Sequence, residues 1–281
     1  MLGVSGDVVN AGAAAAAAGA SVALIARVSD DELGDAVCRR IRELGIDDTY
    51  VRRVPGQQGV YFLHIDPDGN RQFSYARAGS VGSQLDVADL PEGVIENAGA
   101  VLGGGIAAAL SPTVARAMLE VAQRSGRFVY DPNFRPRLTT AEQARAFLQQ
   151  IAPYTEVMVP SAPSEIELLL GTTEPENAAA TLMGWGARSV VVTQGSDGSS
   201  IFTDTGTSHQ PVIPALEVID QTGAGDVFAG TLTARLALGD DLREASALAA
   251  AAASLSVGGR GGTGLIAPLP EIRRHREYVP T

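Results

Sequence analysis

An aspartate follows a run of small residues in the stretch Thr222-Gly223-Ala224-Gly225-Asp226. The apolar residues after it recur at helical spacing, so the small residues stand at the start of a predicted helix. The backbone N–H groups of Gly223, Ala224 and Gly225 would point at an anion there, and the helix dipole adds to their attraction. A carboxylate in the first turn could accept the proton of an attacking hydroxyl while the amides hold a phosphoryl group. Asp226 is therefore the candidate catalytic base.

The alternative is that Asp226 belongs to the first turn of a purely structural helix, which is the commoner role of a lone aspartate at that position. The glycines around it favour catalysis. The apolar run from Ala215 to Ile219 predicts a strand that leads into the small residues. The sequence contains no GxxxxGK[ST] motif, so a P-loop kinase is not supported.

A second group of short polar side chains precedes an alanine-rich helix near the start of the chain. Gly6, Asp7 and Asn10 could bind the hydroxyl groups of a polyol, or Asp7 or Asn10 could simply cap the helix. The run from Ala13 to Ala18 predicts a closely packed helix rather than disorder, because alanine is the best helix former.

A third group, from Asp131 to Arg137, follows a predicted strand, where open α/β sheets place their ligands. Arg135 stands between Phe134 and Pro136, so its backbone is restrained. A restrained guanidinium can hold a carboxylate or phosphate by two parallel hydrogen bonds. A proline-rich turn with solvated arginines is the alternative.

Predicted strands and helices alternate along the chain, which indicates a doubly wound, mostly parallel α/β sheet with helices on both faces. We predict a single domain over residues 1–281. The predicted elements are strands at 22–26, 100–102, 127–130, 156–159 and 189–193, and helices at 10–19, 35–44, 112–123, 141–151, 165–170 and 176–185.

Residues 49–79 break this alternation and predict an inserted β-hairpin that forms a small lid. Two strand-like runs, 59–65 and 71–77, are joined by the turn residues Asp66 to Asn70. Tyr61, Tyr75 and Arg77 occupy alternate positions, so one face of the hairpin could reach a ligand.

Two glycine-rich motifs resemble dinucleotide-binding fingerprints, and neither has the required context. Residues 103–108 fit GxGxxA, but the next helix is expected to begin only at Ser111-Pro112. Residues 259–264 fit GxGxxG, but they lie too near the end of the sequence to build a βαβ unit.

Composition excludes several classes of partner. The chain has 281 residues and a net charge of −11, which argues against nucleic acid and anionic membranes. Its apolar runs are shorter than the ~20 residues of a membrane span. Cys38 is the only cysteine, which fits a cytoplasmic protein in a reducing compartment.

Taken together and in order, these segments resemble the ribokinase-like (PfkB) family of sugar kinases over nearly the whole chain. The family's catalytic base matches Asp226, and its Gly-Gly-x-x-x-Asn substrate loop matches 5–10, with Ser5 in place of the first glycine. Residues 75–77, 110–113 and 133–137 are most similar to the branch that phosphorylates 2-dehydro-3-deoxygluconate.

The resemblance implies an ATP-dependent kinase that acts on the terminal hydroxyl of this sugar acid, with Mg²⁺ bridging the ATP phosphates. Glu165 matches the glutamate of a metal-linked Asn-x-x-Glu motif, although Ala162 replaces the asparagine, and Gln221 replaces the usual Thr or Asp. The resemblance further implies sugar binding by Tyr61, Tyr75, Arg77 and Arg135. It implies nucleotide binding by Asn133, Thr193, Gly195, Ser196 and Gly198. A hairpin turn with no role in binding is the alternative for the segment from Thr193 to Gly198.

Two other functions stay open at this point. One is a related kinase for a neutral sugar such as fructose or ribose, which would give no reason for two arginines and two tyrosines at the site. The other is a degenerate, ligand-binding paralogue, against which the intact Gly-Ala-Gly-Asp argues. A lid hairpin could pair with a second copy, so a homodimer is plausible. Because few residues precede Ser5, we also expect a native core strand and a lid strand to be missing from the front of this chain.

Overall fold

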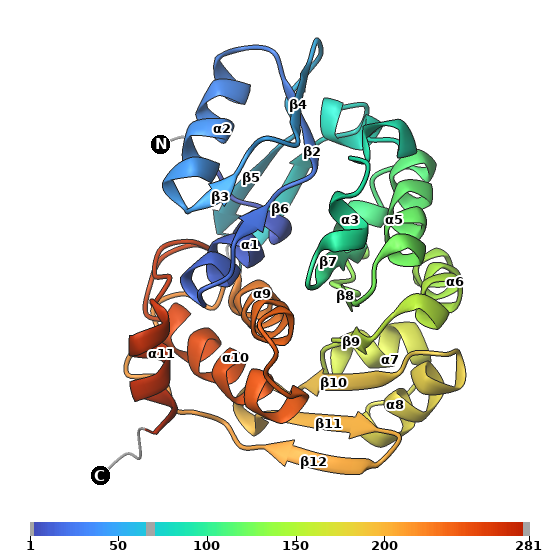
Figure 1. Ribbon diagram of the computed structural model, residues 1–281, viewed down its shortest axis with the longest axis vertical. Coiled ribbons are helices and arrows are strands. Elements are labelled where there is room, and N and C mark those ends of the chain that lie inside the picture. The colour runs from blue at the N-terminus through green and yellow to red at the C-terminus, as the bar shows by residue number, and fades with distance from the viewer. Residues whose placement is uncertain (1–2, 66–70, 278–281) are drawn as a thin grey trace.

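The computed structural model describes residues 3–65 and 71–277, and its centre is a six-stranded sheet (Figure 1). The strand order is β12-β11-β10-β9-β8-β7, with β7 to β10 parallel and β11 and β12 antiparallel. The strands are β7 (Val101–Gly104), β8 (Phe128–Asp131), β9 (Val157–Met158), β10 (Ser189–Thr193), β11 (Ser199–Thr203) and β12 (Gly206–Gln210).

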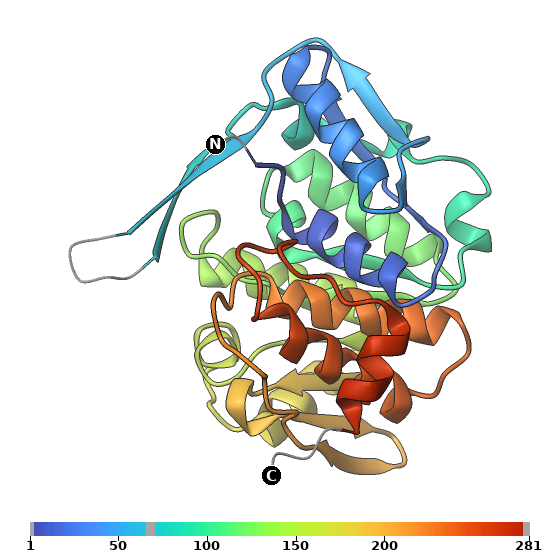
Figure 2. The same ribbon diagram turned by 90° about the vertical axis from the view of Figure 1, so that its left-hand side faces the viewer.

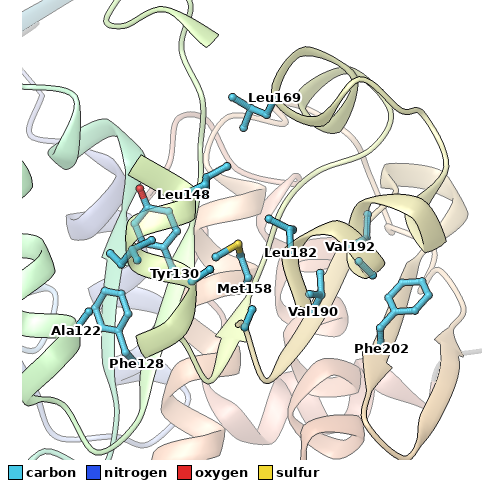
Figure 3. Close-up of a cluster of buried hydrophobic side chains, with 14 of the residues drawn as sticks. Ala122, Phe128, Tyr130, Leu148, Met158, Leu169, Leu182, Val190, Val192 and Phe202 are labelled. Atoms are coloured by element: carbon cyan, nitrogen blue, oxygen red, sulfur yellow. The ribbon is translucent and has the colours of Figure 1, made fainter. Parts of the chain in front are cut away.

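Helices cover both faces of this sheet, which confirms the predicted fold class. One face carries α5 (Pro112–Arg124), α6 (Ala141–Ile151), α7 (Ser164–Leu170) and α8 (Pro175–Gly184), and the other carries α9 (Ala224–Ala237) and α10 (Leu242–Ser256). Successive strand residues point to opposite faces. Val190 and Val192 therefore join the core beneath α8 (Figure 3), whereas Val191 packs against α9 and α10.

The N-terminal part of the chain forms smaller parallel strand pairs beside the main sheet. Strand β1 (Val22–Ala23) pairs with β3 (Ile46–Asp47), and β2 (Ala26–Ser29) pairs with β4 (Val51–Val54). The run predicted as one strand at 22–26 is thus divided between two. In the described part, β7 has a strand partner on one side only.

The predicted lid is present as an antiparallel hairpin of β5 (Val60–Ile65) and β6 (Arg71–Ala76), which extends away from the body of the molecule (Figure 2). The predicted turn at 66–70 lies outside the described residues. The remaining helices are α1 (Asp7–Ala17), α2 (Glu32–Glu43), α3 (Val94–Asn97), α4 (Gly105–Ala108) and α11 (Leu269–Arg276). Within the described residues, no helix combines the length and apolar character that crossing a bilayer requires.

The prediction of a strand at 215–219, before Asp226, was wrong. Residues 215–219 form an irregular segment in which Leu216 and Val218 are mostly exposed. The backbone N–H groups of Ile219 and Asp220 both donate to the carbonyl of Val257, at 2.8 and 2.9 Å, rather than to a neighbouring strand. The apolar run alone was not sufficient to predict a strand, because the backbone hydrogen bonds of this segment go to the end of a helix and not to a sheet.

The alanine-rich helix α1 packs closely against α9 (Figure 1), as its composition predicts. A Cβ atom at Gly230 on α9 would lie only 2.1 Å from the carbonyl oxygen of Ala11. Small residues on both helices thus permit a close crossing. This crossing brings the polar residues at the start of α1 next to the start of α9.

Candidate active site

Helix α9 begins at the small-residue turn, and a glycine makes that turn possible. Gly223 has φ 84°, a left-handed conformation that other residues adopt at a cost. A Cβ there would lie 2.6 Å from the Cα of Gly262. Position 223 thus requires glycine for two reasons: its backbone conformation and the lack of space for a side chain. The N–H groups of Gly225 and Asp226, in the first turn, have no preceding helical carbonyl to bond, whereas the N–H of Ala224 donates to the carbonyl of Gln221 at 3.3 Å.

Asp226 lies in that first turn and accepts a hydrogen bond on each carboxylate oxygen. The Nδ2 of Asn10 donates to Oδ2 at 2.8 Å, and the Nδ2 of Asn133 donates to Oδ1 at 3.2 Å. The structure thus brings residues from α1, from the loop after β8 and from α9 to one point. A small cavity adjoins them, lined by Asp7, Val8, Ala11, Leu102, Gly103, Gly104, Asp131, Asn133, Asp226 and Ala229.

The environment raises the pKa of Asp226 to about 7. Burial is the main cause, and the negative charge of Asp7 adds to it, whereas the Asn10 and Asn133 amides and the Arg135 guanidinium lower the pKa. A carboxylate with this pKa is a stronger base than a solvated one and is still ionised in a large share of molecules near neutral pH.

Asp7, the first residue of α1, lies within electrostatic range of both arginines that the sequence singled out. Burial raises its pKa, and the charges of Arg77 and Arg135 act in the opposite direction. Its Oδ2 atom is buried and has no hydrogen-bond partner among the described residues. A buried acceptor of this kind is costly unless a ligand satisfies it, which fits the predicted role of Asp7 in binding a substrate hydroxyl. Gly6 precedes it as the N-cap residue of α1.

The lid presents its three singled-out residues on one face. Tyr61 and Tyr75 are directly opposite each other in the β5–β6 pairing, and Arg77 follows two residues later. The Arg77 guanidinium lies over the Tyr75 ring, 5.8 Å from its centroid. Arg77 thus stacks on the Tyr75 ring, and its charge also acts on Asp7.

The loop after β8 is held by two buried carboxyl groups. Oδ1 of Asp131 accepts the N–H of Asn133 at 3.0 Å, and Asn133 has a left-handed φ of 40°. Glu165 accepts the N–H of Phe134 at 2.6 Å and that of Ser161 at 2.7 Å. Burial raises the pKa of both carboxyl groups, that of Asp131 well above its usual range.

These contacts bear on the predicted metal role of Glu165. Each of its oxygens already accepts a backbone N–H, which leaves one lone pair on each for a water molecule. In the described part of the chain, no three His, Cys, Asp or Glu side chains gather as a metal site. The donor set suits a magnesium ion that is carried by phosphate oxygens and needs only one or two protein groups.

The segment Thr193–Gly198 connects β10 to the antiparallel β11, so the hairpin-turn interpretation describes its backbone correctly. Gly195 and Gly198 have left-handed φ values of 57° and 83°. Thr193 also bridges to Ser161, at the sheet edge where β8 and β9 end. A role with nucleotide for Thr193, Gly195, Ser196 and Gly198 stays a prediction.

Sequence reasoning missed a second glycine loop at the site. Asp220 accepts the N–H of Thr222 on one oxygen and that of Gly261 on the other, both at 2.8 Å. It thereby ties the loop at 259–264, set aside above as a false dinucleotide motif, to the turn before α9. The signal in the sequence was Asp220 itself, an acidic residue two positions before a glycine turn.

The start of a glycine-rich helix, a buried carboxyl group in its first turn and a doubly wound α/β fold are the features expected of a small-molecule kinase. The comparisons with known proteins agree. The model of the pfkB family of carbohydrate kinases matches residues 2–268. The chain therefore belongs to the PfkB carbohydrate kinase family.

Several individual proteins are similar to this chain over nearly its whole length. A 2-dehydro-3-deoxygluconokinase of Thermoproteus tenax is 36% identical, over 98% of this chain and 85% of the relative. A 2-dehydro-3-deoxygalactonokinase of Haloferax volcanii is 28% identical, over 94% and 85%. Among solved structures, a candidate ribokinase II from E. coli in complex with ATP and Mg²⁺ has a TM-score of 0.86 at 25% identity, over 98% of this chain and 91% of that one.

Proposed function

We propose that this protein is an ATP-dependent kinase that phosphorylates the terminal hydroxyl of 2-dehydro-3-deoxygluconate. The observation that carries the proposal is Asp226, a carboxylate with a pKa of about 7 in the first turn of α9, directly after the glycine turn. The name of the Thermoproteus tenax relative supports the choice of substrate.

In the proposed reaction, Asp226 accepts the proton of the sugar hydroxyl as the hydroxyl oxygen attacks the γ-phosphorus of ATP. The new O–P bond forms as the bond to the β-γ bridging oxygen breaks, and ADP leaves. The backbone N–H groups of Gly223, Ala224 and Gly225 stabilise the negative charge on the transferring group. The proton then passes from Asp226 to solvent.

The carboxylate of the sugar acid explains the cations around the pocket. The charges of Arg77 and Arg135 both act on Asp7, which supports their assignment to the sugar side of the site. We assign them to the substrate carboxylate, and Tyr61 and Tyr75 to its oxygen atoms. Gly6, Asp7 and Asn10 form the substrate loop at the start of α1. A neutral sugar gives no role to two arginines, so this arrangement favours the acid.

For the nucleotide, we propose Asn133 and the Thr193–Gly198 loop, through Thr193, Gly195, Ser196 and Gly198. Phosphate oxygens would supply most ligands of the Mg²⁺ ion, with Glu165 contributing through water. The E. coli neighbour was solved in complex with ATP and Mg²⁺, which supports the use of this nucleotide and this metal. When bound, the metal ion neutralises charge on the phosphates.

We also propose a homodimer formed through the lid. The β5–β6 hairpin extends from the body of the protein, and Phe62 on it is 63% exposed. An exposed apolar residue on a projecting hairpin favours pairing with a second copy. Light scattering after size-exclusion chromatography should give twice the chain mass of 29.0 kDa, and a monomer mass for Phe62→Asp. A wild-type monomer would refute the dimer.

The substrate is tested by ADP formation with a panel of equal concentrations of 2-dehydro-3-deoxygluconate, its galactonate epimer, fructose and ribose. We expect the highest kcat/KM with a 2-dehydro-3-deoxy sugar acid. A higher value with fructose or ribose would identify a neutral-sugar kinase instead. No ADP formation with any sugar, together with intact ATP binding, would support a non-catalytic protein.

A further inference from the structure

The two asparagines that hold Asp226 come from distant parts of the chain. Asn10 lies in α1, 216 residues before Asp226, and Asn133 lies in the loop after β8, 93 residues before it. Each donates an amide hydrogen to a different carboxylate oxygen. A carboxylate held on both oxygens cannot rotate freely about its Cβ–Cγ bond, so its orientation is fixed.

Further contacts fix the Asn10 amide and the Asn133 backbone. The Oγ of Ser5 donates to Oδ1 of Asn10 at 3.1 Å, which leaves Nδ2 as the group directed at the carboxylate. Asn10 is only 3% exposed. The backbone of Asn133 is fixed by the bond from its N–H to Asp131, in a left-handed conformation.

Gly262, in the loop at 259–264, packs directly against the side chain of Asn10. A Cβ atom at Gly262 would lie 2.1 Å from Nδ2 and 2.5 Å from Cγ of Asn10, far inside contact distance. The bond between Asp220 and the neighbouring Gly261 keeps this loop in place. Any larger residue at 262 would push the Asn10 amide out of its position.

We propose that Asn10 and Asn133 form an amide clamp that positions the carboxylate of Asp226, and that Ser5 and Gly262 hold the Asn10 side of the clamp in place. The inference deepens the proposed function, since the clamp matters for turnover only where Asp226 is the base. It assigns Asn10 and Asn133 as positioning residues, in addition to any contact with sugar or nucleotide.

The clamp has a measurable electrostatic consequence. The charged groups that act on Asp226 are Asp7 from α1, Asp131 from the end of β8 and Arg135 from the loop that follows. All three stay in place when a clamp amide is removed. A charge-assisted hydrogen bond is then lost from the ionised form alone, so the pKa of Asp226 should rise by about one to two units.

The first test needs no substrate. Asp226 is titrated in the free protein by NMR of ¹³C-carboxyl-labelled aspartate, and its signal is assigned by its loss in Asp226→Asn. Asn10→Ala suits an alanine-rich helix, and Asn133→Gly tolerates the left-handed backbone. We expect either change to raise the titration midpoint. Unchanged midpoints in both variants would overturn the clamp, whatever the enzyme phosphorylates.

Gly262→Ala extends this test without altering any polar group. Its methyl group should displace the Asn10 amide and raise the midpoint of Asp226 as Asn10→Ala does. The control is Gly126→Ala, where a Cβ would meet nothing within 4 Å. A midpoint that stays at the wild-type value in Gly262→Ala would show that the loop does not hold Asn10, and would overturn that part of the proposal.

The second test separates positioning from direct substrate contact. With the sugar that the panel identifies, Asn10→Ala should lower kcat at neutral pH by about tenfold or more and move the acidic limb of the pH profile upward. A rise in sugar KM with an unmoved pH limb would instead make Asn10 a substrate ligand only, and would overturn its role in the clamp.

Discussion

The raised pKa of Asp226 predicts that this aspartate lowers the stability of the folded protein at neutral and alkaline pH. The folded-state pKa is about 7, against 3.8 for a solvated aspartate. Below pH 3.8 the group is protonated in both states and has no effect. As the pH rises toward 7, the unfolded chain releases the proton first, so stability is lost, and the loss is complete above pH 7.

The magnitude follows from the same pKa values. Each pKa unit corresponds to about 1.4 kcal/mol, so the full cost of ionised Asp226 is about 4 kcal/mol, of which roughly 2–3 kcal/mol develops between pH 5 and pH 8. Asp226→Asn removes this cost. It also replaces one acceptor oxygen by an NH₂ group that faces an asparagine donor, a loss of about 1 kcal/mol that does not depend on pH.

Urea unfolding at pH 5 and pH 8 measures the prediction. The free energy of unfolding of Asp226→Asn, relative to wild type, should increase by about 2–3 kcal/mol from pH 5 to pH 8. Asp204→Asn, at an exposed position, controls for the removal of one negative charge. A difference between wild type and Asp226→Asn that is the same at both pH values would refute the raised pKa.

Other consequences of the site are open to direct measurement. Arg77→Ala and Arg135→Ala should each weaken binding of the sugar acid by about 10- to 150-fold, and should weaken binding of a matched neutral polyol less. Competition binding measures both affinities. Equal losses for the two ligands would exclude recognition of the carboxylate by these arginines. Activity should disappear in excess chelator and return with Mg²⁺, and full activity in chelator would contradict the proposed metal requirement. Glu165→Gln should raise the Mg²⁺ concentration needed for half-maximal activity, and an unchanged value would remove Glu165 from the metal's surroundings.

The local parts of this structure could be predicted from the sequence because their signals are local. The strand at 189–193 and the helix at 141–151 have the predicted bounds. The strand is a short apolar run, and the helix begins directly after the capping residue Thr140. The start of α9 follows from its glycines. The strand expected at 215–219 failed because an apolar run does not reveal where its backbone hydrogen bonds go.

Contacts between distant segments were beyond sequence reasoning. The motifs that contain Asn10 and Asn133 predicted binding of sugar and nucleotide. Only the structure shows that both side chains reach Asp226, Asn10 through the crossing of α1 and α9 and Asn133 from the loop after β8. The sequence indicated a metal-linked role for Glu165, and the structure shows in addition that its oxygens accept the backbone N–H groups of Phe134 and Ser161. Side-chain roles of this kind depend on which loops meet at the sheet edge, and residue type alone does not determine that.

The most direct test of the central claim is the turnover of Asp226→Asn on the sugar acid that the panel identifies. Asparagine keeps the shape of aspartate but cannot accept the hydroxyl proton, so kcat should fall by about 10²–10⁴-fold. ATP affinity, measured separately by calorimetry, should stay near that of wild type, because the N–H groups at the start of α9 are unchanged. A kcat near the wild-type value would contradict the assignment of Asp226 as the catalytic base.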